Sequence, residues 1–246
     1  MIRIIGDVEG RKVDWVVPWY GQVHTISLAL SDQYKSYFQR LGERYGPINY
    51  IVDVGACIGT MSISYANSFP DAEILALEPS RFNYPYLVHN VRPYPQIKCI
   101  KMAAFNESGK VRISNPTEIQ RFERNDLSVN TGLIGIHGKS NVFAENVDCD
   151  LLDNIVTRKV DYLKIDIEGG EIEALNGALR ILGTDRPIIQ IEARAENQNM
   201  AGRGEGSVHG FMWSNKYASY GAITADWVFI PVERVKHEDF TDASSG

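Results

Sequence analysis

Short apolar runs alternate with longer amphipathic segments along most of the chain after residue 50. Five of the runs have the length of a buried strand: residues 50–54, 73–78, 97–103, 160–167 and 186–193. Apolar residues at helical spacing lie between them, in the sets Tyr84, Leu87, Val88, Val91 and Ile172, Leu175, Leu179, Leu182, the second within a helix expected over 171–182. Strands that alternate with such helices predict parallel βαβ units and an α/β, doubly wound, mostly parallel sheet.

The first part of the chain does not follow this alternation. Residues 1–49 are mixed in character, and we expect them to form an N-terminal cap with a helix near residues 32–41. The aromatic residues Trp15, Trp19 and Tyr20 could stack on a sugar ring, or they could seal this segment onto the sheet.

One domain is expected over residues 50–246. Within it, residues 109–150 are polar with short strand-like runs, which indicates an insertion. Residues 202–210 hold four glycines and predict a mobile loop that closes over a ligand. Two closely spaced apolar runs, 220–224 and 227–232, predict an antiparallel final hairpin.

Composition narrows the possible partners and location. The 246 residues are 44% apolar and carry a net charge of -6, so no global field attracts nucleic acid. The longest uncharged run, residues 54–70, contains glycine, serine and asparagine, so we expect no membrane insertion. The first fifteen residues have no apolar run of secretory-signal length. Three cysteines at unrelated spacings indicate reduced thiols and a cytoplasmic protein.

A glycine-rich turn follows the first of the five strands. In the stretch IVDVGACIGTMS, residues 51–62, Gly55 and Gly59 separate the strand from a helix. The spacing matches neither a phosphate-binding P-loop nor the G-x-G-x-x-G dinucleotide fingerprint. Asp53 places an anion where it would repel a phosphate, so a cationic or amino-bearing ligand suits the turn better. An ordinary packing turn is the alternative.

Acidic residues stand at the ends of several predicted strands, where open α/β sheets bind their ligands. Glu78 follows Gly55 by 23 residues, the separation at which an acid can bind the ribose hydroxyls of an adenosine-containing ligand. It could instead cap the next helix. Asp166 and Glu168 end the fourth strand, and Glu192 ends the fifth.

Three stretches together resemble the FkbM-type S-adenosylmethionine-dependent methyltransferases: VDVGACIG, LEPSRFNYPYLVHNV and DYLKIDIEGGEIEALNGAL. The resemblance covers about residues 50–195, and the closing DWVFIP is also in character. It implies a Rossmann-like, seven-stranded methyltransferase sheet with its last strand inserted antiparallel. It also implies methyl transfer from S-adenosylmethionine, commonly to a hydroxyl of a sugar or a natural product.

Carried over to this chain, the resemblance implies that Asp53 and Gly55 meet the methionine end of the cofactor and that Glu78 holds its ribose. The backbone of Met102 and Ala103 would lie near the adenine. The remaining implied cofactor residues are Ala56, Cys57, Gly59 and Pro79. The family usually has asparagine at the position of Cys57, so one polar contact is in question there, although a backbone contact would remain. A reactive thiol is the other reading of Cys57.

The strand-end acids suggest how a hydroxyl could be activated. We expect Asp166 and Glu192 to converge, with Glu168 joining them, so that a carboxylate takes the acceptor proton. Two alternatives stay open: Glu168 caps the next helix while Asp166 orders the turn, or the acids hold a divalent cation. We favour the metal-free base, because no further ligand is obviously placed to complete an oxygen-rich shell.

O-methylation of a small-molecule or saccharide acceptor is therefore the leading function. N-methylation on the same scaffold and a non-catalytic adenosine-ligand binding module are the alternatives. His24, His209, Arg194, Asn197 and Asn215 are candidate acceptor contacts that could equally be ordinary loop residues.

Overall fold

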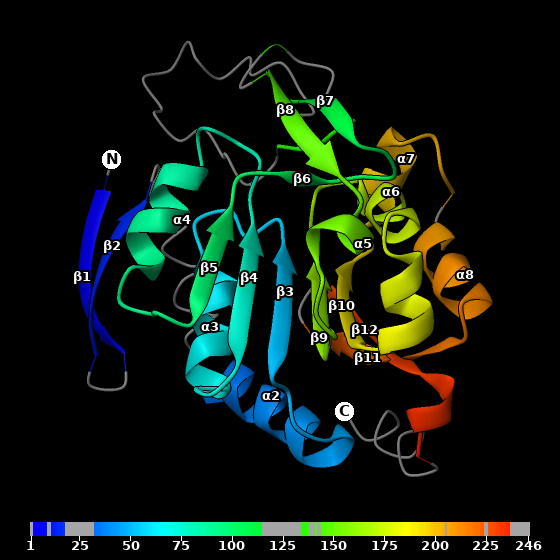
Figure 1. Ribbon diagram of the computed structural model, residues 1–246, viewed down its shortest axis with the longest axis horizontal. Coiled ribbons are helices and arrows are strands. Elements are labelled where there is room, and N and C mark those ends of the chain that lie inside the picture. Colours follow the sequence, from blue (N-terminus) through cyan, green and yellow to red (C-terminus); the bar gives the residue numbers. More distant parts are fainter. Residues whose placement is uncertain are drawn as a thin grey trace.

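The computed structural model describes residues 2–8, 11–17, 32–114, 134–137, 141, 144–204, 206–223 and 226–236. Figure 1 shows a central sheet with helices on both of its faces. His24, Trp19 and Tyr20 lie outside the described residues.

The central sheet has seven strands in the order β11-β12-β10-β9-β3-β4-β5. Five are parallel: β3 (Tyr50–Val54), β4 (Glu73–Leu77), β5 (Ile97–Ile100), β9 (Tyr162–Ile165) and β10 (Ile188–Glu192). The last two, β11 (Tyr217–Ile223) and β12 (Asp226–Pro231), pair antiparallel, and β12 adds antiparallel to β10. The predicted seven-stranded, mostly parallel sheet with an antiparallel final hairpin is confirmed.

Helices cover the two faces because the strands alternate apolar side chains between them. On one face lie α2 (Asp32–Tyr45), α3 (Thr60–Ser68) and α4 (Tyr84–Val91), packed on residues such as Ile51 and Ile74. On the other lie α5 (Leu152–Ile155), α6 (Glu171–Asn176) and α8 (Ser207–Ser214), packed on residues such as Val52 and Leu75. A further short helix, α7 (Ala195–Met200), follows β10.

The N-terminal segment contains more than the predicted helix. Strands β1 (Ile2–Val8) and β2 (Arg11–Val17) form an antiparallel hairpin that lies beside α4 (Figure 1). Asn90 fastens it: the Val16 amide donates to Asn90 Oδ1 at 2.8 Å, and Asn90 Nδ2 donates to the Val16 carbonyl at 3.2 Å. Trp15 is buried in the core beside α2 and α3, which supports its sealing role.

The two described strands of the polar segment after residue 109 belong to a second sheet. Its strands are β6 (Ala103–Ala104), β7 (Gly109–Ile113) and β8 (Glu145–Asp150), in the order β6-β8-β7. Figure 1 shows this sheet lying across the carboxyl ends of the central strands. The predicted strand 97–103 is therefore two strands in different sheets, because Ala103 and Ala104 leave the central sheet to pair with β8.

The predicted helix 171–182 is also interrupted. A side chain at Gly177 would place its Cβ 2.1 Å from the carbonyl oxygen of Phe105, so the backbones pack in direct contact there. α6 ends before this glycine, and a π-helical turn, η3 (Ile181–Asp185), follows. The break turns Leu179 outward to 52% exposure, although the sequence predicted it to share the buried face of Leu175. Val88 on α4 is likewise exposed.

The glycine segment 202–210 is not a loop throughout. Gly206, at φ 87°, precedes the first turn of α8, and Val208 and Met212 on that helix are buried. The prediction of a loop is therefore wrong for residues 207–210, because apolar residues at helical spacing outweigh the flexibility of glycine. None of the described helices is long and apolar enough to cross a membrane.

Candidate active site

The glycine turn brings the end of β3 against the end of β9. Gly55 adopts φ 83°, and a Cβ there would lie 1.9 Å from the carbonyl oxygen of Asp166. The amides of Gly55 and Ala56 both donate to the Leu77 carbonyl at 2.9 Å. Only glycine fits such a position, because it combines a left-handed backbone with direct contact between two chains.

Replacing Gly55 with alanine should destabilise the fold by roughly 2–5 kcal/mol, since strain from the left-handed backbone adds to overpacking. Gly46→Ala is the matched control: its φ is 99°, but nothing lies within 4 Å of its Cβ position. That variant should cost only about 1–2 kcal/mol. Urea denaturation of both variants measures the difference, and equal losses would contradict the close contact at Gly55.

Gly59 has a different role from Gly55. Its Cβ would lie 2.9 Å from Val91 Cγ1 and 3.0 Å from Leu87 Cδ1, so α3 packs closely on α4 at this point. The alternative of a packing glycine therefore describes Gly59, whereas Gly55 lies at the cavity described below.

Glu78 follows β4 and is bonded to the glycine turn. Its carboxylate accepts the backbone amide of Cys57 and that of Ser80, both at 2.9 Å. Burial raises the pKa of Glu78 to about 7, while these hydrogen bonds oppose the shift. The Asn83 side chain also bonds this carboxylate, which has about four acceptor positions, so the group retains capacity for one hydroxyl of a ligand. Burial also raises the pKa of the Cys57 thiol, which argues against a reactive cysteine.

A cavity lies over the turn, at the carboxyl ends of the central strands. Six predicted cofactor residues and two predicted catalytic ones line it: Gly55, Cys57, Glu78, Pro79, Met102, Ala103, Asp166 and Glu168. The residues Asp53, Ala56, Gly59 and Glu192, also predicted for the site, are not part of this lining. Strand β7 supplies Ile113, and the segment between β7 and β8 supplies residues 134–136; no sequence pattern had marked these residues.

Asp53 lies beneath the turn instead of facing the cavity. It is fully buried, and its Oδ2 accepts the Ser62 hydroxyl at 2.6 Å. Its other oxygen, Oδ1, is 4.0 Å from the ammonium of Lys164, the residue beside it on β9. The structure therefore places Asp53 where it supports the turn.

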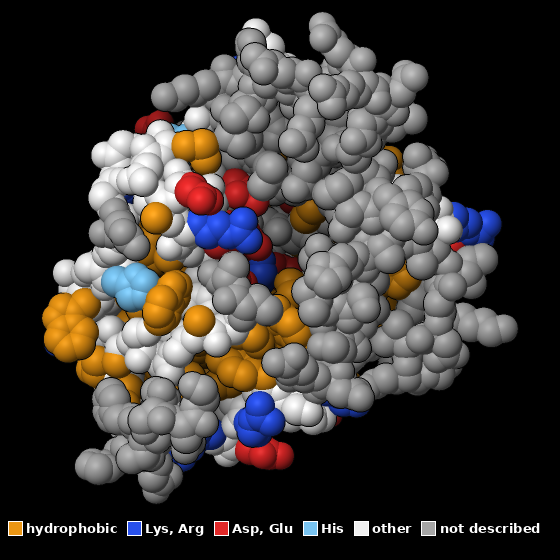
Figure 2. All heavy atoms as spheres, turned by 180° about the vertical axis from the view of Figure 1, so that it is seen from behind, with side chains coloured by type: hydrophobic (Ala, Val, Ile, Leu, Met, Phe, Trp, Pro, Cys, Tyr) orange, Lys and Arg blue, Asp and Glu red, His pale blue; other side chains and the backbone are white. Residues whose placement is uncertain are grey.

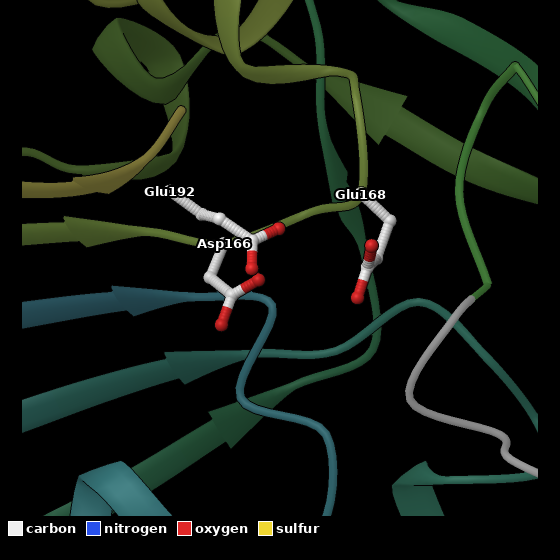
Figure 3. Close-up of side chains that lie close together, drawn as sticks. All are labelled: Asp166, Glu168 and Glu192. Carbon is white, nitrogen blue, oxygen red and sulfur yellow. The ribbon is translucent and has the colours of Figure 1, made fainter. Parts of the chain in front are cut away.

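The three predicted catalytic acids converge. One carboxylate oxygen from each of Asp166, Glu168 and Glu192 lies within 4.8 Å of the others. In Figure 3, Asp166 and Glu192 point toward one another from neighbouring strand ends, and Glu168 faces them from the loop after β9. Such a group can share protons or a cation. Figure 2 shows acidic and basic side chains together around a hollow on this face.

Two cations lie against this acidic cluster, defined here as Asp166, Glu168 and Glu192. The Lys164 ammonium is 3.0 Å from Asp166 Oδ2, and Arg194 Nε is 2.8 Å from Glu192 Oε1. Neighbouring carboxylates raise the pKa of Lys164 despite its burial, so it stays charged. No sequence pattern marks Lys164, because a lysine within an apolar strand gives no sign of its neighbours.

The members of the cluster differ in acidity. Burial, with the neighbouring Asp166, raises the pKa of Glu168 to about 7. Burial, with Asp166 and Glu168, raises the pKa of Glu192 to about 9, although Arg194 opposes this. Near neutral pH, Glu192 therefore holds a proton, whereas Glu168 is poised to gain or lose one. This makes Glu168 a better proton acceptor than Glu192.

A buried network of side-chain hydrogen bonds lies next to the acidic cluster. Gln190 Oε1 accepts the hydroxyls of Tyr65 at 2.9 Å and Tyr162 at 2.7 Å, and its Nε2 donates to Asp226 Oδ2 at 2.7 Å. Asp226 is paired in register with Glu192, and burial raises its pKa to about 6. A sequence signal for Asp226 existed, since it precedes the last predicted strand, but the antiparallel register was needed to place it.

These shifts predict how the stability of the ligand-free protein depends on pH. Four carboxyls have folded-state pKa values above the 4.5 or 3.8 of the unfolded chain: Glu78, Glu168, Glu192 and Asp226. The folded protein therefore binds protons that the unfolded chain releases, and stability should fall as pH rises from about 5 to about 9. Burial lowers the pKa of His209, which makes stability rise with pH. This concerns a single group, and only pH values below about 6.5.

Urea denaturation at pH 5.5, 7 and 8.5 measures this dependence. Glu192→Gln should flatten the decline between pH 7 and 8.5, because it removes the carboxyl with the highest pKa of the four. Stability that is constant or rises over the whole range would contradict the raised values.

The candidate acceptor contacts lie in different surroundings. Asn197 and Arg194 contact the acidic cluster, as the hydrogen bond from Asn197 to Glu192 at 2.9 Å shows. His209 packs edge-on against Trp227 and Phe229 instead, with ring centroids 4.7 and 5.1 Å away. Asn215 donates to the Phe211 carbonyl at the end of α8, which is an ordinary helix-end contact.

Comparison with known proteins identifies the family. The model of the methyltransferase FkbM domain matches residues 53–219, more than half of the chain. No curated protein sequence matches. Among solved structures, methyltransferase FkbM from Methylobacillus flagellatus KT aligns at 17% identity and a TM-score of 0.52, covering 85% of this chain. The chain spans 58% of that protein.

A second similar structure is a putative caffeoyl-CoA O-methyltransferase from Staphylococcus aureus. It has 10% identity and a TM-score of 0.50, and the alignment covers 86% of this chain and 90% of that one. At these identities the structures support the fold alone. The family match is what decides: the chain belongs to the FkbM methyltransferase family.

Proposed function

We propose that the protein transfers a methyl group from S-adenosylmethionine to a hydroxyl of a small-molecule or saccharide acceptor. One observation carries the proposal: Glu78 and the turn at Gly55 line the same cavity as Asp166 and Glu168. The residues suited to hold an adenosine ligand therefore adjoin the residues suited to take a proton. A binding module alone would not need the second set.

The cavity has the features that this cofactor requires. Glu78 presents a buried carboxylate for the ribose hydroxyls, and Met102 and Ala103 supply backbone beside it for the adenine. Gly55 lines the cavity and presents its backbone where the methionine end would approach. When bound, the sulfonium supplies the methyl group. The acidic cluster adds negative charge nearby, which favours a cationic ligand over a pyrophosphate.

The residues of the cluster then have distinct tasks. Glu168, with a pKa of about 7, accepts the proton of the acceptor hydroxyl, because a base works best with a pKa near the working pH. Asp166, which faces the cavity beside Lys164, orients that hydroxyl. Glu192 holds its proton near neutral pH, and its hydrogen bond from Asn197 helps to keep the cluster in place.

A hydroxyl suits this arrangement better than an amine. An alcohol is a weak nucleophile near pH 7 and gains most from an adjacent base, whereas a free amine needs little help. The free cysteines support the expectation of a cytoplasmic protein, and the net charge of -6 supports the expectation that nucleic acid is not the acceptor.

The test is a transfer screen with S-adenosylmethionine labelled in its methyl group. Saccharides and glycolipids would be offered with and without an amino group, each in the presence of chelator and of added magnesium. We expect label on oxygen, with turnover that survives chelation. Label on nitrogen alone would favour the amine alternative, and loss of turnover on chelation would favour a cation held by the acidic cluster.

A further inference from the structure

Helix α7 lies against the loop that carries Glu168. Two of its residues, Asn197 and Gln198, are buried, whereas Glu196 and Asn199 on either side of them are exposed. Gln198 Nε2 donates to Glu171 Oε2 at 2.9 Å, and Gln198 Oε1 accepts the Ser207 hydroxyl at 2.9 Å. The helix is thus fixed between α6 and α8, so its inward side chains have defined positions.

Glu171 completes the anchoring of the loop. Its Oε1 accepts the Gly169 amide at 2.9 Å, and its Oε2 takes the bond from Gln198. The sequence suggested only a favourable interaction with a helix dipole for Glu171. Its full burial and its hydrogen bonds to two segments show that it also links the loop after β9 to α7.

Asn197 joins two members of the acidic cluster through one nitrogen. Its Nδ2 donates to Glu168 Oε2 and to Glu192 Oε2, each at 2.9 Å. An amide NH₂ has two hydrogens, so both are used. The two acids come from different elements, the loop after β9 and the end of β10, so this amide links two separate segments.

The backbone at Glu168 needs such a restraint. Glu168 adopts φ 55° and Gly169 φ 106°, a left-handed pair that a glutamate rarely enters without support. The Asn197 carbonyl oxygen lies 3.1 Å from the Cβ position of Gly169, so the helix and the loop are in close contact. The side-chain hydrogen bond from Asn197 and its backbone contact with Gly169 therefore hold the same turn.

We propose that Asn197 is a positioning residue, which holds the carboxylates of Glu168 and Glu192 together and keeps Glu168 turned to the cavity. This inference rests on the proposed function, because it assigns Asn197 a part in preparing the proton acceptor. Asn197 acts through the two acids and does not itself take a proton. Its amide is essential, since a side chain without a donor cannot bond two carboxylates at once.

The test compares Asn197→Asp, Asn197→Ala and the control Asn199→Ala. Asn199 is exposed on the same helix, so its replacement keeps the cluster intact. Protein labelled with ¹³C at glutamate carboxyls is titrated by NMR without any acceptor, and the signals of Glu168 and Glu192 are assigned with the Glu→Gln variants. The groups that face Glu168 are Asp166, Glu171, Glu192 and Arg194.

Loss of the donated bond should raise the apparent pKa of Glu168 by about one unit in Asn197→Ala. Asn197→Asp should raise it further, since it adds a negative charge, and Asn199→Ala should match the wild type. A purely structural role predicts wild-type titration of Glu168 in Asn197→Ala, with a shift only where aspartate adds charge. Wild-type titration of Glu168 in Asn197→Ala would overturn the inference.

Two further measurements keep the outcomes separate. If Asn197→Ala fails to fold, Asn197→Leu is titrated in its place, because it keeps the size of the side chain and lacks both a donor and a charge. Calorimetry with S-adenosylmethionine is run on the same samples. A wild-type protein that does not bind the cofactor would refute the proposed function, whereas bound cofactor with unaltered glutamate titration would refute only the role of Asn197.

Discussion

Glu168→Gln should lower the rate of methyl transfer by roughly 10²–10⁴-fold, the usual contribution of a general base. Glutamine keeps the size of the side chain and can still accept the bond from Asn197, but it cannot take a proton. The affinity for S-adenosylmethionine should stay close to that of the wild type. The acceptor found in the transfer screen provides the assay, with labelled product as the readout.

Two other variants sharpen this prediction. Glu192→Gln resembles the protonated form that Glu192 already has near neutral pH, so its loss should be far smaller, about tenfold or less. Glu196→Gln replaces an exposed carboxylate of α7 and should leave the rate unchanged. In the wild type, the rate should rise as pH increases through about 7, where Glu168 loses its proton. Full turnover by Glu168→Gln, or a greater loss in Glu192→Gln, would assign the base elsewhere.

Glu78→Ala should weaken the binding of S-adenosylmethionine by roughly 1.5–3 kcal/mol, the value of hydrogen bonds to a charged group. Calorimetry measures the change. Glu73→Ala, at the exposed start of the same strand, is the control and should bind normally. Because the pKa of Glu78 is about 7, wild-type affinity should also decrease as pH falls below that value and the carboxylate is protonated.

Folding of the Glu78 variant needs a separate check, since alanine leaves the amides of Cys57 and Ser80 without their acceptor. Glu78→Gln retains an acceptor oxygen for one of these two amides, which bond different oxygens of the carboxylate, and should be the more stable of the two variants in thermal unfolding. Unchanged cofactor affinity in both would remove Glu78 from the site.

The sheet and the convergence of acids could be predicted for one physical reason. Parallel strands end at the same edge, so residues that follow them, such as Glu78, Asp166 and Glu192, must gather there. The position of Gly55 followed from the same logic, because a strand that turns directly into a helix needs a left-handed residue.

Other parts of the site depend on contacts that a single sequence does not display. Lys164 and Gln190 lie inside apolar strands, and their roles emerge only once β9 is known to lie between β3 and β10. Gly177 interrupts a strongly periodic helix because the distant Phe105 backbone lies against it. Asn197 is one polar residue among several after β10, and nothing local distinguishes it from the exposed Asn199.

Calorimetric titration of the wild-type protein tests the central claim most directly. S-adenosylmethionine, its demethylated product and NAD would each be added to the ligand-free protein at pH 7.5, where Glu78 is mostly ionised. The two adenosyl amino acids should bind with one site per chain, and NAD should not, because the turn lacks the middle glycine that makes room for a pyrophosphate. Absence of binding by S-adenosylmethionine, or stoichiometric binding of NAD, would contradict the account.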